Sequence, residues 1–333
     1  QAELLVDDYL PQSIDVKKFY LEDYESPPGG VTKPLARQAA RQYLNSGLSI
    51  FHYIGHGAEN TLADEQVFIT DDIYSLSNGM RRGIFIAFSC DVGVYDSTSR
   101  QSMAEVFISQ ESGGTIAAIA ASQVSWVFQN DTLSRFFYQS LYPEQQVIGT
   151  STLGGGLNFA KVLIGTGSPF SMANSQRYLL YGDPGLRLSQ PVSDLGFSAG
   201  CSDTLGGGRT ENIEIILSDY GMTPGSQVSY NLFVQESRHD MVTDEYSFHY
   251  WLPGSATFHG TGIVDSDTLV VPFKVPLQLQ YGDFGKMRLV INDGINKRST
   301  SVELPVAQVP LEPNDDFTGP IINLAFEDDR YRV

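Results

Sequence analysis

Three short apolar runs in the first half of the chain most constrain how it can fold. They cover residues 48–54, 83–89 and 115–121, and segments with a helical pattern lie before, between and after them. The runs are mostly apolar rather than strictly alternating, which is typical of parallel strands buried on both faces. Strands of this kind with helices between them predict an α/β domain whose parallel sheet is covered by helices on both sides.

The pattern changes near Pro191, where Gly, Ser, Asp and Thr begin to punctuate short alternating runs. Six such runs follow without a convincing helix, at residues 212–217, 227–235, 246–252, 268–275, 286–292 and 300–306. Short strands spaced by turns indicate an immunoglobulin-like β-sandwich. We therefore expect an α/β domain at 1–190, a β-sandwich at 191–308, and a linker or the start of a further module at 309–333.

The charge balance argues against nucleic acid as a partner. The chain has 39 acidic and 21 basic residues and a formal net charge of −18, which suits a phosphate backbone poorly. Clustered carboxylates could instead hold calcium as a structural ion, at Asp64 and Glu65 or at Asp71 and Asp72. Solvated loop acids are the simpler reading of both pairs. We predict no required cofactor and no catalytic metal.

The cysteine count and the hydropathy exclude two further classes. Only Cys90 and Cys201 are present, so a disulfide framework is ruled out, and the two lie in different predicted domains. No apolar run reaches the roughly 18–20 residues of a membrane span. We therefore expect no membrane-spanning segment in this chain.

Two reactive side chains follow neighbouring apolar runs. His56 stands between Gly55 and Gly57 after the first run, and Cys90 follows the second. Sites in open α/β sheets gather beyond the carboxyl ends of strands. An imidazole beside a thiol supports nucleophilic attack on a carbonyl by the thiolate. A histidine that merely caps a strand and a buried structural cysteine are the simpler alternatives.

The segments around these two residues resemble the gingipain family of cysteine peptidases, part of the caspase-like clan. The resemblance covers about residues 1–190, and it rests on an ordered set of motifs rather than on any single one. The motifs are His52-Tyr53-Ile54-Gly55-His56-Gly57-Ala58-Glu59, Asn78, Ala87-Phe88-Ser89-Cys90-Asp91-Val92-Gly93, Ser102-Met103-Ala104-Glu105, Gly113-Gly114-Thr115-Ile116, Tyr181-Gly182-Asp183-Pro184 and Leu186-Arg187-Leu188.

The resemblance implies a caspase-like fold with His56 and Cys90 as a catalytic dyad. It also implies an oxyanion hole from the backbone N–H groups of Gly57 and Cys90. In the family a carboxylate orients the catalytic histidine, and the matching position would precede Gln1. We therefore expect the N-terminal part of the catalytic domain to lie outside this sequence, and we assign no third member of the site.

The same resemblance suggests how a substrate is held and where the protein works. The stretch from Ala121 to Trp126 is similar to the one that walls the first substrate pocket, so Trp126 and Gln123 are candidate pocket residues. Looser matches at residues 275–286 and 316–321 resemble the sortase-like peptidase of type IX secretion. They imply a secreted or cell-surface protein, associated with the bacterial outer membrane, that meets protein or peptide substrates and other secretion-system or cell-surface components.

The function predicted from the sequence is thus a cysteine endopeptidase, with a sortase-like transpeptidase as a variant of it. Cys90 is the nucleophile and His56 is its proton-transfer partner. Two alternatives remain at this stage: a catalytically inactive peptidase-like module for binding or scaffolding, and a metal-dependent hydrolase that uses histidine and acidic residues.

Overall fold

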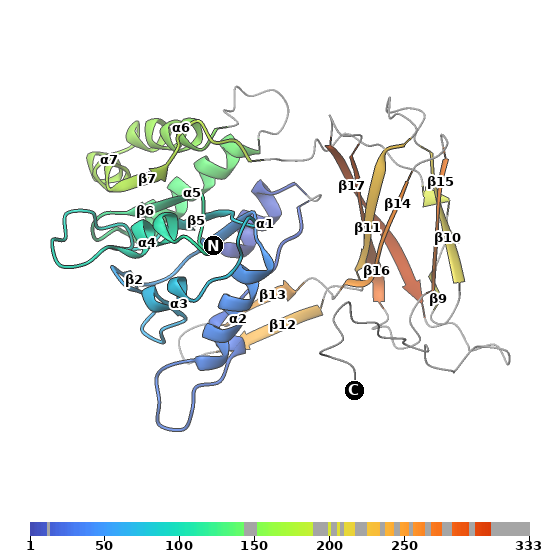
Figure 1. Ribbon diagram of the computed structural model, residues 1–333, viewed down its shortest axis with the longest axis horizontal. Coiled ribbons are helices and arrows are strands. Elements are labelled where there is room, and N and C mark those ends of the chain that lie inside the picture. The colour runs from blue at the N-terminus through green and yellow to red at the C-terminus, as the bar shows by residue number, and fades with distance from the viewer. Residues whose placement is uncertain are drawn as a thin grey trace, which may run out of the picture. The chain divides into compact units, whose positions relative to one another are not determined.

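The computed structural model divides the chain into two compact units, Gln1–Gln190 and Pro191–Val333 (Figure 1). In the first unit it describes residues 1–11, 14–142 and 152–188. In the second unit it describes residues 225–226 and the strands named below. Cys201 and the predicted linker at 309–333 lie outside the described residues.

A four-stranded sheet forms the centre of the first unit, in the order β1 (Ile50–Tyr53), β5 (Ile84–Ala87), β6 (Ala117–Ala121) and β7 (Tyr178–Gly182). The first three strands are parallel, which confirms the three predicted runs. Strand β7 is antiparallel to β6 and was not predicted. It is half-exposed at the edge of the sheet and carries two tyrosines, so it lacks the continuous apolar signal of the other three.

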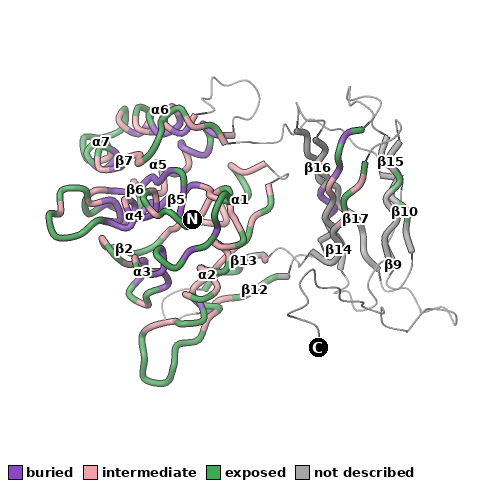
Figure 2. Tube along the Cα trace, in the orientation of Figure 1, coloured by how far each residue is buried: buried purple, intermediate pink, exposed green. Residues whose placement is uncertain are grey.

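Both faces of this sheet are covered, as the apolar runs predict, because successive residues of a strand point to opposite sides. On β5, Phe85 and Ala87 face a core built with α2 (Pro34–Ser46), α3 (Thr70–Tyr74) and α4 (Met103–Ser109). Ile84 and Ile86 face a second core built with α1 (Ala2–Tyr9), α5 (Val127–Leu141) and α6 (Leu153–Gly165). Figure 2 shows the buried residues concentrated along these central strands.

The remaining elements of the first unit are short. A 3₁₀ turn, Leu21–Asp23, precedes α2, and α7 (Pro169–Gln176) follows α6. A small antiparallel sheet of β2 (Gly57–Ala58), β3 (Thr61–Leu62) and β4 (Phe68–Ile69) lies directly after His56 in the chain. This small sheet fixes the segment that leaves the first strand of the central sheet.

In the second unit neighbouring strands are antiparallel, except for β17 and β9, which are parallel. One sheet has the order β14-β11-β16-β17-β9 and a second the order β15-β10-β8, while β12 and β13 form a hairpin. The six predicted strands appear as β10 (Thr210–Ile216), β11 (Gln227–Phe233), β13 (Ser247–Leu252), β15 (Thr268–Lys274), β16 (Gly282–Asn292) and β17 (Lys297–Ala307). The immunoglobulin-like arrangement of these strands stays a prediction.

Four strands of the second unit were not predicted from the sequence. They are β8 (Ala199–Gly200), β9 (Leu205–Gly206), β12 (Ser237–Val242) and β14 (Ala256–Ile263). Two of them are only two residues long, and the other two mix histidine, glycine or charged residues with few apolar ones. Backbone pairing with a neighbouring strand forms them where the side-chain pattern alone gives a weak signal.

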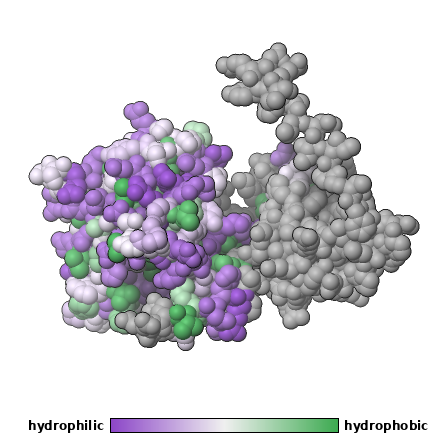
Figure 3. Space-filling view, turned by 90° about the horizontal axis from the view of Figure 1, so that it is seen from below, coloured by the Kyte–Doolittle hydropathy of each residue, from purple (hydrophilic) through white to green (hydrophobic). Residues whose placement is uncertain are grey.

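The surface of the first unit is mixed. The face seen in Figure 3 is mostly hydrophilic, with apolar residues scattered over it. Within the described residues, no helix combines the length and the apolar character that crossing a bilayer requires.

Candidate active site

The register of the central sheet aligns His56 with Cys90. Strands β1 and β5 are parallel, and Tyr53 is paired with Ala87 at their carboxyl ends. His56 and Cys90 each follow three residues beyond that pair. Neighbouring strands lie about 4.8 Å apart, so continuing the two chains brings these residues to the same edge of the sheet.

Two contacts hold the loops together past the ends of the strands. The Ser89 hydroxyl donates a 2.6 Å hydrogen bond to the Gly55 carbonyl. Gly57 packs so closely on the other loop that an added Cβ would lie 2.5 Å from Ser89 Oγ, 2.7 Å from Val92 Cγ2 and 3.0 Å from the Cys90 carbonyl oxygen. Glycine is therefore required at position 57 for this close approach.

Cys90 is a free, half-buried cysteine whose sulfur is hydrogen-bonded to Ser125. The backbone N–H of Ser125 donates to Sγ over 3.3 Å, and the Ser125 hydroxyl lies 3.8 Å from the same sulfur. The thiol in turn donates to the Ser125 carbonyl over 3.3 Å. The fold thus holds the sulfur in a defined position.

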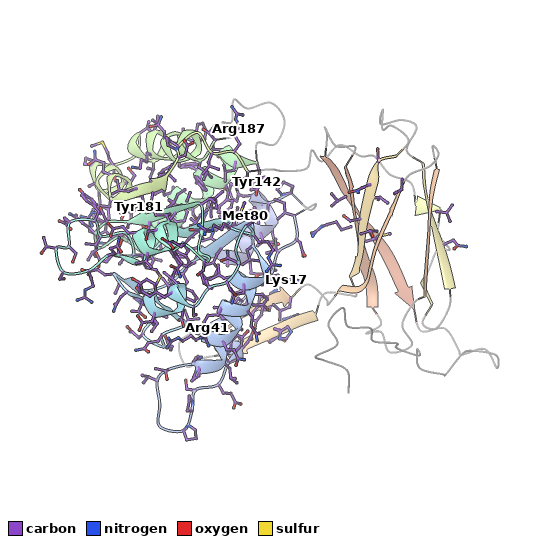
Figure 4. The ribbon with its side chains drawn as sticks, in the orientation of Figure 1. Lys17, Arg41, Met80, Tyr142, Tyr181 and Arg187 are labelled. Atoms are coloured by element: carbon purple, nitrogen blue, oxygen red, sulfur yellow. The ribbon has the colours of Figure 1, made fainter. Side chains whose placement is uncertain are left out.

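The turn after Cys90 is tight and fixed on both sides. Asp91 has a φ of 57°, a left-handed conformation that few non-glycine residues adopt. Its N–H donates to the Gln123 carbonyl, and the Gly93 N–H donates to the Ala121 carbonyl over 2.8 Å. The hydroxyl of Tyr181, labelled in Figure 4, donates to the Gly93 carbonyl. Two neighbouring strands therefore anchor the loop that presents Cys90.

Asp91 also brings charge to this edge of the sheet. Burial, and then the charge of Glu59, raise the pKa of the Asp91 carboxyl, while Arg177 opposes them. The carboxyl that follows Cys90 in the chain is therefore partly buried and lies near both an acidic and a basic side chain.

His56 is held by its backbone rather than by its ring. The Tyr53 hydroxyl donates to the His56 carbonyl over 2.6 Å, and the Ala63 N–H donates to the same oxygen over 2.9 Å. The residue is exposed. Among the residues that the structure describes, none forms a hydrogen bond with the His56 ring, so no carboxylate is seen to orient it.

The other histidine of this segment is of a different kind. His52 lies on β1 with its ring buried between Phe88 and Tyr138, and its Nδ1 is 2.8 Å from the Tyr138 hydroxyl. Burial lowers the pKa of His52 to about 4. His52 is thus held within the sheet by its ring contacts, away from the loop that carries His56.

The two candidate pocket residues follow β6. Trp126 caps the N-terminus of α5, and its ring lies 4.2 Å from that of Phe170, with the guanidinium of Arg177 4.1 Å from the indole centroid. Gln123 is exposed and uses its carbonyl to hold Asp91. Their role as pocket residues stays a prediction.

Behind Cys90 lies a set of polar side chains that the sequence did not single out. Ser125, Asn130, Asn174 and Tyr178 are all buried and joined by hydrogen bonds. They come from the loop after β6, two helices and β7, so no spacing along the chain connects them. The one signal in the sequence is that asparagine, a weak helix former, lies inside both α5 and α7.

The described residues offer no cluster of three or more histidine, cysteine or acidic side chains that could hold a metal ion. The expectation that Asp72 is a solvated loop acid is wrong. Asp72 is buried, caps α3 and accepts from Arg37 over 2.8 Å, with Arg41 3.6 Å away. Two arginines compensate its charge, so Asp72 is satisfied without calcium, and a calcium site elsewhere stays a prediction.

Three parallel strands and an antiparallel edge strand, with a cysteine and a histidine beyond the carboxyl ends of adjacent strands, define an α/β domain with a candidate thiol site at that edge of the sheet. The family model described as Peptidase family C25 matches residues 2–189. The chain therefore belongs to peptidase family C25, the family of the gingipains.

The similarities to solved structures described below are distant. No curated protein matches the chain. The solved structures it resembles include the Arg specific cysteine proteinase gingipain R, with 17% identity and a TM-score of 0.45 over 85% of this chain and 57% of that one. A complex of Porphyromonas gingivalis RgpB pro- and mature domains gives 17% identity and a TM-score of 0.42 over 85% and 58%. The chain thus spans a little over half of the proteins it resembles.

Proposed function

We propose that this protein is a cysteine endopeptidase in which Cys90 is the nucleophile and His56 transfers the proton. The observation that supports the proposal most directly is the strand register, which carries both residues equally far beyond the Tyr53–Ala87 pair. Membership of peptidase family C25 supports the reaction class independently. Protein or peptide chains are then the substrates.

The chemistry requires two proton movements. The Cys90 thiol loses its proton to the His56 imidazole, and the thiolate attacks the peptide carbonyl to give a tetrahedral intermediate. As the C–N bond breaks, the imidazolium returns the proton to the leaving amine and a thioester remains. Water hydrolyses that thioester, or an amine attacks it if the protein acts as a sortase-like transpeptidase.

The oxyanion of the intermediate needs donors close to the sulfur. We propose the backbone N–H groups of Gly57 and Cys90 for this role. The supporting contact is the close approach of Gly57 to Cys90: a Cβ added at position 57 would lie 3.0 Å from the Cys90 carbonyl oxygen. A donor without a side chain allows a substrate carbonyl to come equally near.

The finer parts of the proposal rest on resemblance. Trp126 and Gln123 would line the pocket for the substrate residue before the scissile bond. The second unit would be an immunoglobulin-like support or docking module, and calcium would be a structural ion. A secreted or cell-surface location, associated with the outer membrane and with type IX secretion components, follows from the similarity to the sortase-like peptidase.

The reaction class is tested with a panel of peptidyl acyloxymethyl ketones that differ in the residue next to the warhead. We expect one or more to modify Cys90 at least about 100-fold faster than free cysteine, because a bound peptide places the warhead at the activated thiolate. Mass spectrometry locates the adduct. Cys90→Ala abolishes labelling, whereas Cys201→Ala, the matched control at the other cysteine, leaves it unchanged.

The preferred warhead then gives the sequence of a fluorogenic substrate, and amine acceptors in the same assay separate transfer from hydrolysis. An inactive binding or scaffold module is the correct reading if Cys90 reacts no faster than free cysteine with every member of the panel. Activity lost to a chelator but not to the ketones would indicate metal-dependent hydrolysis.

A further inference from the structure

Four buried polar side chains form a hydrogen-bonded group that reaches the sulfur of Cys90 through Ser125. Ser125 is 7% exposed, Asn130 5%, and Asn174 and Tyr178 are fully buried. Buried polar groups persist only where their hydrogen bonds are made, since each unmade one costs free energy. Of these four, Ser125 is hydrogen-bonded to the sulfur, through its N–H, its carbonyl and its hydroxyl.

The orientation of the two asparagine amides follows from one backbone group. The N–H of Trp126 can only donate, so the atom of Asn174 that it meets at 2.9 Å is Oδ1. The amide nitrogen of Asn174 therefore faces Asn130 Oδ1 at 3.0 Å. This leaves the amide nitrogen of Asn130 to donate to Ser125 Oγ at 2.8 Å. The same nitrogen also lies 3.4 Å from the Phe88 carbonyl, which can only accept.

The hydroxyl of Tyr178 supplies a second hydrogen to Ser125. It lies 3.1 Å from Ser125 Oγ. Burial raises the pKa of Tyr178, so the phenol keeps its proton. The Tyr178 hydroxyl also interacts with the Asn130 side chain, whose amide nitrogen can only donate, so the phenol's own hydrogen is left to donate to Ser125.

A serine hydroxyl has two acceptor positions and one hydrogen to give. Asn130 and Tyr178 fill both acceptor positions of Ser125 Oγ. The remaining hydrogen is directed to the one other polar atom within reach, Cys90 Sγ at 3.8 Å. The buried side chains therefore determine the direction in which this hydroxyl donates.

We propose that Ser125 is a further residue of the catalytic site, which stabilises the Cys90 thiolate with its hydroxyl and its backbone N–H. Asn130, Asn174 and Tyr178 are positioning residues that keep the hydroxyl hydrogen aimed at the sulfur. The proposal rests on the proposed function, since it assigns a role in activating the same nucleophile.

The hydroxyl favours the charged form of the sulfur. A hydrogen bond to an ionised acceptor is roughly twice as strong as one between neutral groups. The Ser125 carbonyl works the other way, because it accepts the S–H of the thiol at 3.3 Å. The N–H and the hydroxyl both donate, so two donors outweigh one acceptor once the proton has left.

The test is the pH dependence of alkylation of Cys90 by iodoacetamide, followed by mass spectrometry of the peptide that contains Cys90 so that Cys201 does not interfere. In Ser125→Ala the backbone N–H remains and only the hydroxyl is lost. We expect the pH of half-maximal rate to rise by about half a unit, and the rate at pH 7 to fall about threefold.

Tyr178→Phe is the second variant, because it leaves Ser125 and its contacts in place and frees the hydroxyl to turn away. A smaller shift in the same direction is expected. Ser140→Ala is the matched control. Ser140 is buried like Ser125, but it lies on α5, and its hydroxyl has no hydrogen-bond partner among the described residues. Its removal changes packing without touching the sulfur, so the pH profile stays that of the unmodified protein.

The outcomes separate this inference from the proposed function. If Cys90 of the unmodified protein reacts no faster than free cysteine with every peptidyl ketone of the panel, the peptidase proposal itself fails. If that reactivity is high but the half-maximal pH in both Ser125→Ala and Tyr178→Phe stays within 0.1 unit of the control, on the order of assay error, only the role of Ser125 is overturned. A folded Tyr178→Phe protein decides the matter where Ser125→Ala does not fold.

Discussion

The loop of Cys90 and the loop of His56 follow adjacent strands in the same register, yet different contacts hold them. The sulfur of Cys90 contacts three atoms of Ser125, and buried hydrogen bonds hold Ser125 from behind. The His56 loop is fixed through its carbonyl, which accepts from Tyr53 and Ala63, while its ring is exposed. One loop determines a side-chain position, and the other determines only a backbone position.

This difference suggests how the two residues share the proposed reaction. A nucleophile that the fold holds in place needs no ordering when substrate binds. A ring on a fixed backbone can turn between the sulfur and the leaving amine, which the two proton movements require. We therefore expect loss of the His56 ring to lower activity with little change in stability. A change in the packing between the two loops should lower both activity and stability.

The largest effect is expected from His56→Ala. Loss of the proton-transfer group lowers kcat/KM by about 10³-fold, in the middle of the range for general acid–base catalysis. The free energy of unfolding changes by less than about 0.5 kcal/mol, since an exposed ring without a hydrogen bond to the described residues contributes little. The fluorogenic substrate and urea unfolding measure the two quantities.

Tyr53→Phe is the matched control for that variant. It removes the hydrogen bond to the His56 carbonyl and leaves the ring untouched. We expect a loss of about 1 kcal/mol in stability and only a few-fold loss in activity. A stability loss in His56→Ala as large as that in Tyr53→Phe would show that the ring is tethered after all.

The next effect is expected from Gly57→Ala, which forces the two loops apart. The added methyl would meet Ser89 Oγ, Val92 Cγ2 and the Cys90 carbonyl at 2.5, 2.7 and 3.0 Å. Overpacking of this kind costs about 2–3 kcal/mol in the free energy of unfolding. Activity falls in parallel, because the distance between the loops sets the distance between His56 and Cys90.

Gly165→Ala serves as its control. The nearest atom to a Cβ at that position is Met172 Cγ at 3.8 Å, an ordinary contact at the end of α6. Alanine there leaves activity unchanged and raises stability by up to about 1 kcal/mol. Equal behaviour of the two glycine variants would mean that the loops are not packed against each other.

The sequence could predict the parts of the site that depend on strands. Continuous apolar runs indicate buried parallel strands, and the carboxyl ends of such strands gather reactive groups, so Cys90 and His56 could be paired without a structure. Glycine at 57 could likewise be connected with a close approach. The antiparallel edge strand β7 was not predicted, because a strand exposed on one side has no continuous apolar pattern.

The support behind Cys90 could not be predicted for a different reason. Ser125, Asn130, Asn174 and Tyr178 lie on four separate segments, and each is an ordinary residue in its own segment. Only their hydrogen bonds make them a group, and those depend on how α5, α7 and β7 pack. The same is true of Asp72, whose burial follows from two arginines of α2, one helical turn apart.

The smallest predicted effect concerns His52, the buried counterpart of His56 on the same segment. In the folded state burial lowers the His52 pKa to about 4, whereas an exposed histidine has a pKa of 6.5. Between these values the unfolded chain binds the proton and the folded one does not, so the stability that the neutral ring provides above pH 6.5 is lost as the pH falls toward 4.

His52→Phe removes this dependence while it keeps a ring between Phe88 and Tyr138. From the same pKa difference, the drop in the free energy of unfolding between pH 7 and pH 5 is about 2 kcal/mol smaller in the variant than in the unmodified protein. Urea unfolding at the two pH values measures it, and an NMR titration of the His52 ring in the folded protein provides an independent check. Two results would contradict the contrast between the buried ring of His52 and the exposed ring of His56. One is protonation of the His52 ring at pH 6 in the folded protein. The other is an equal drop in the free energy of unfolding in both proteins.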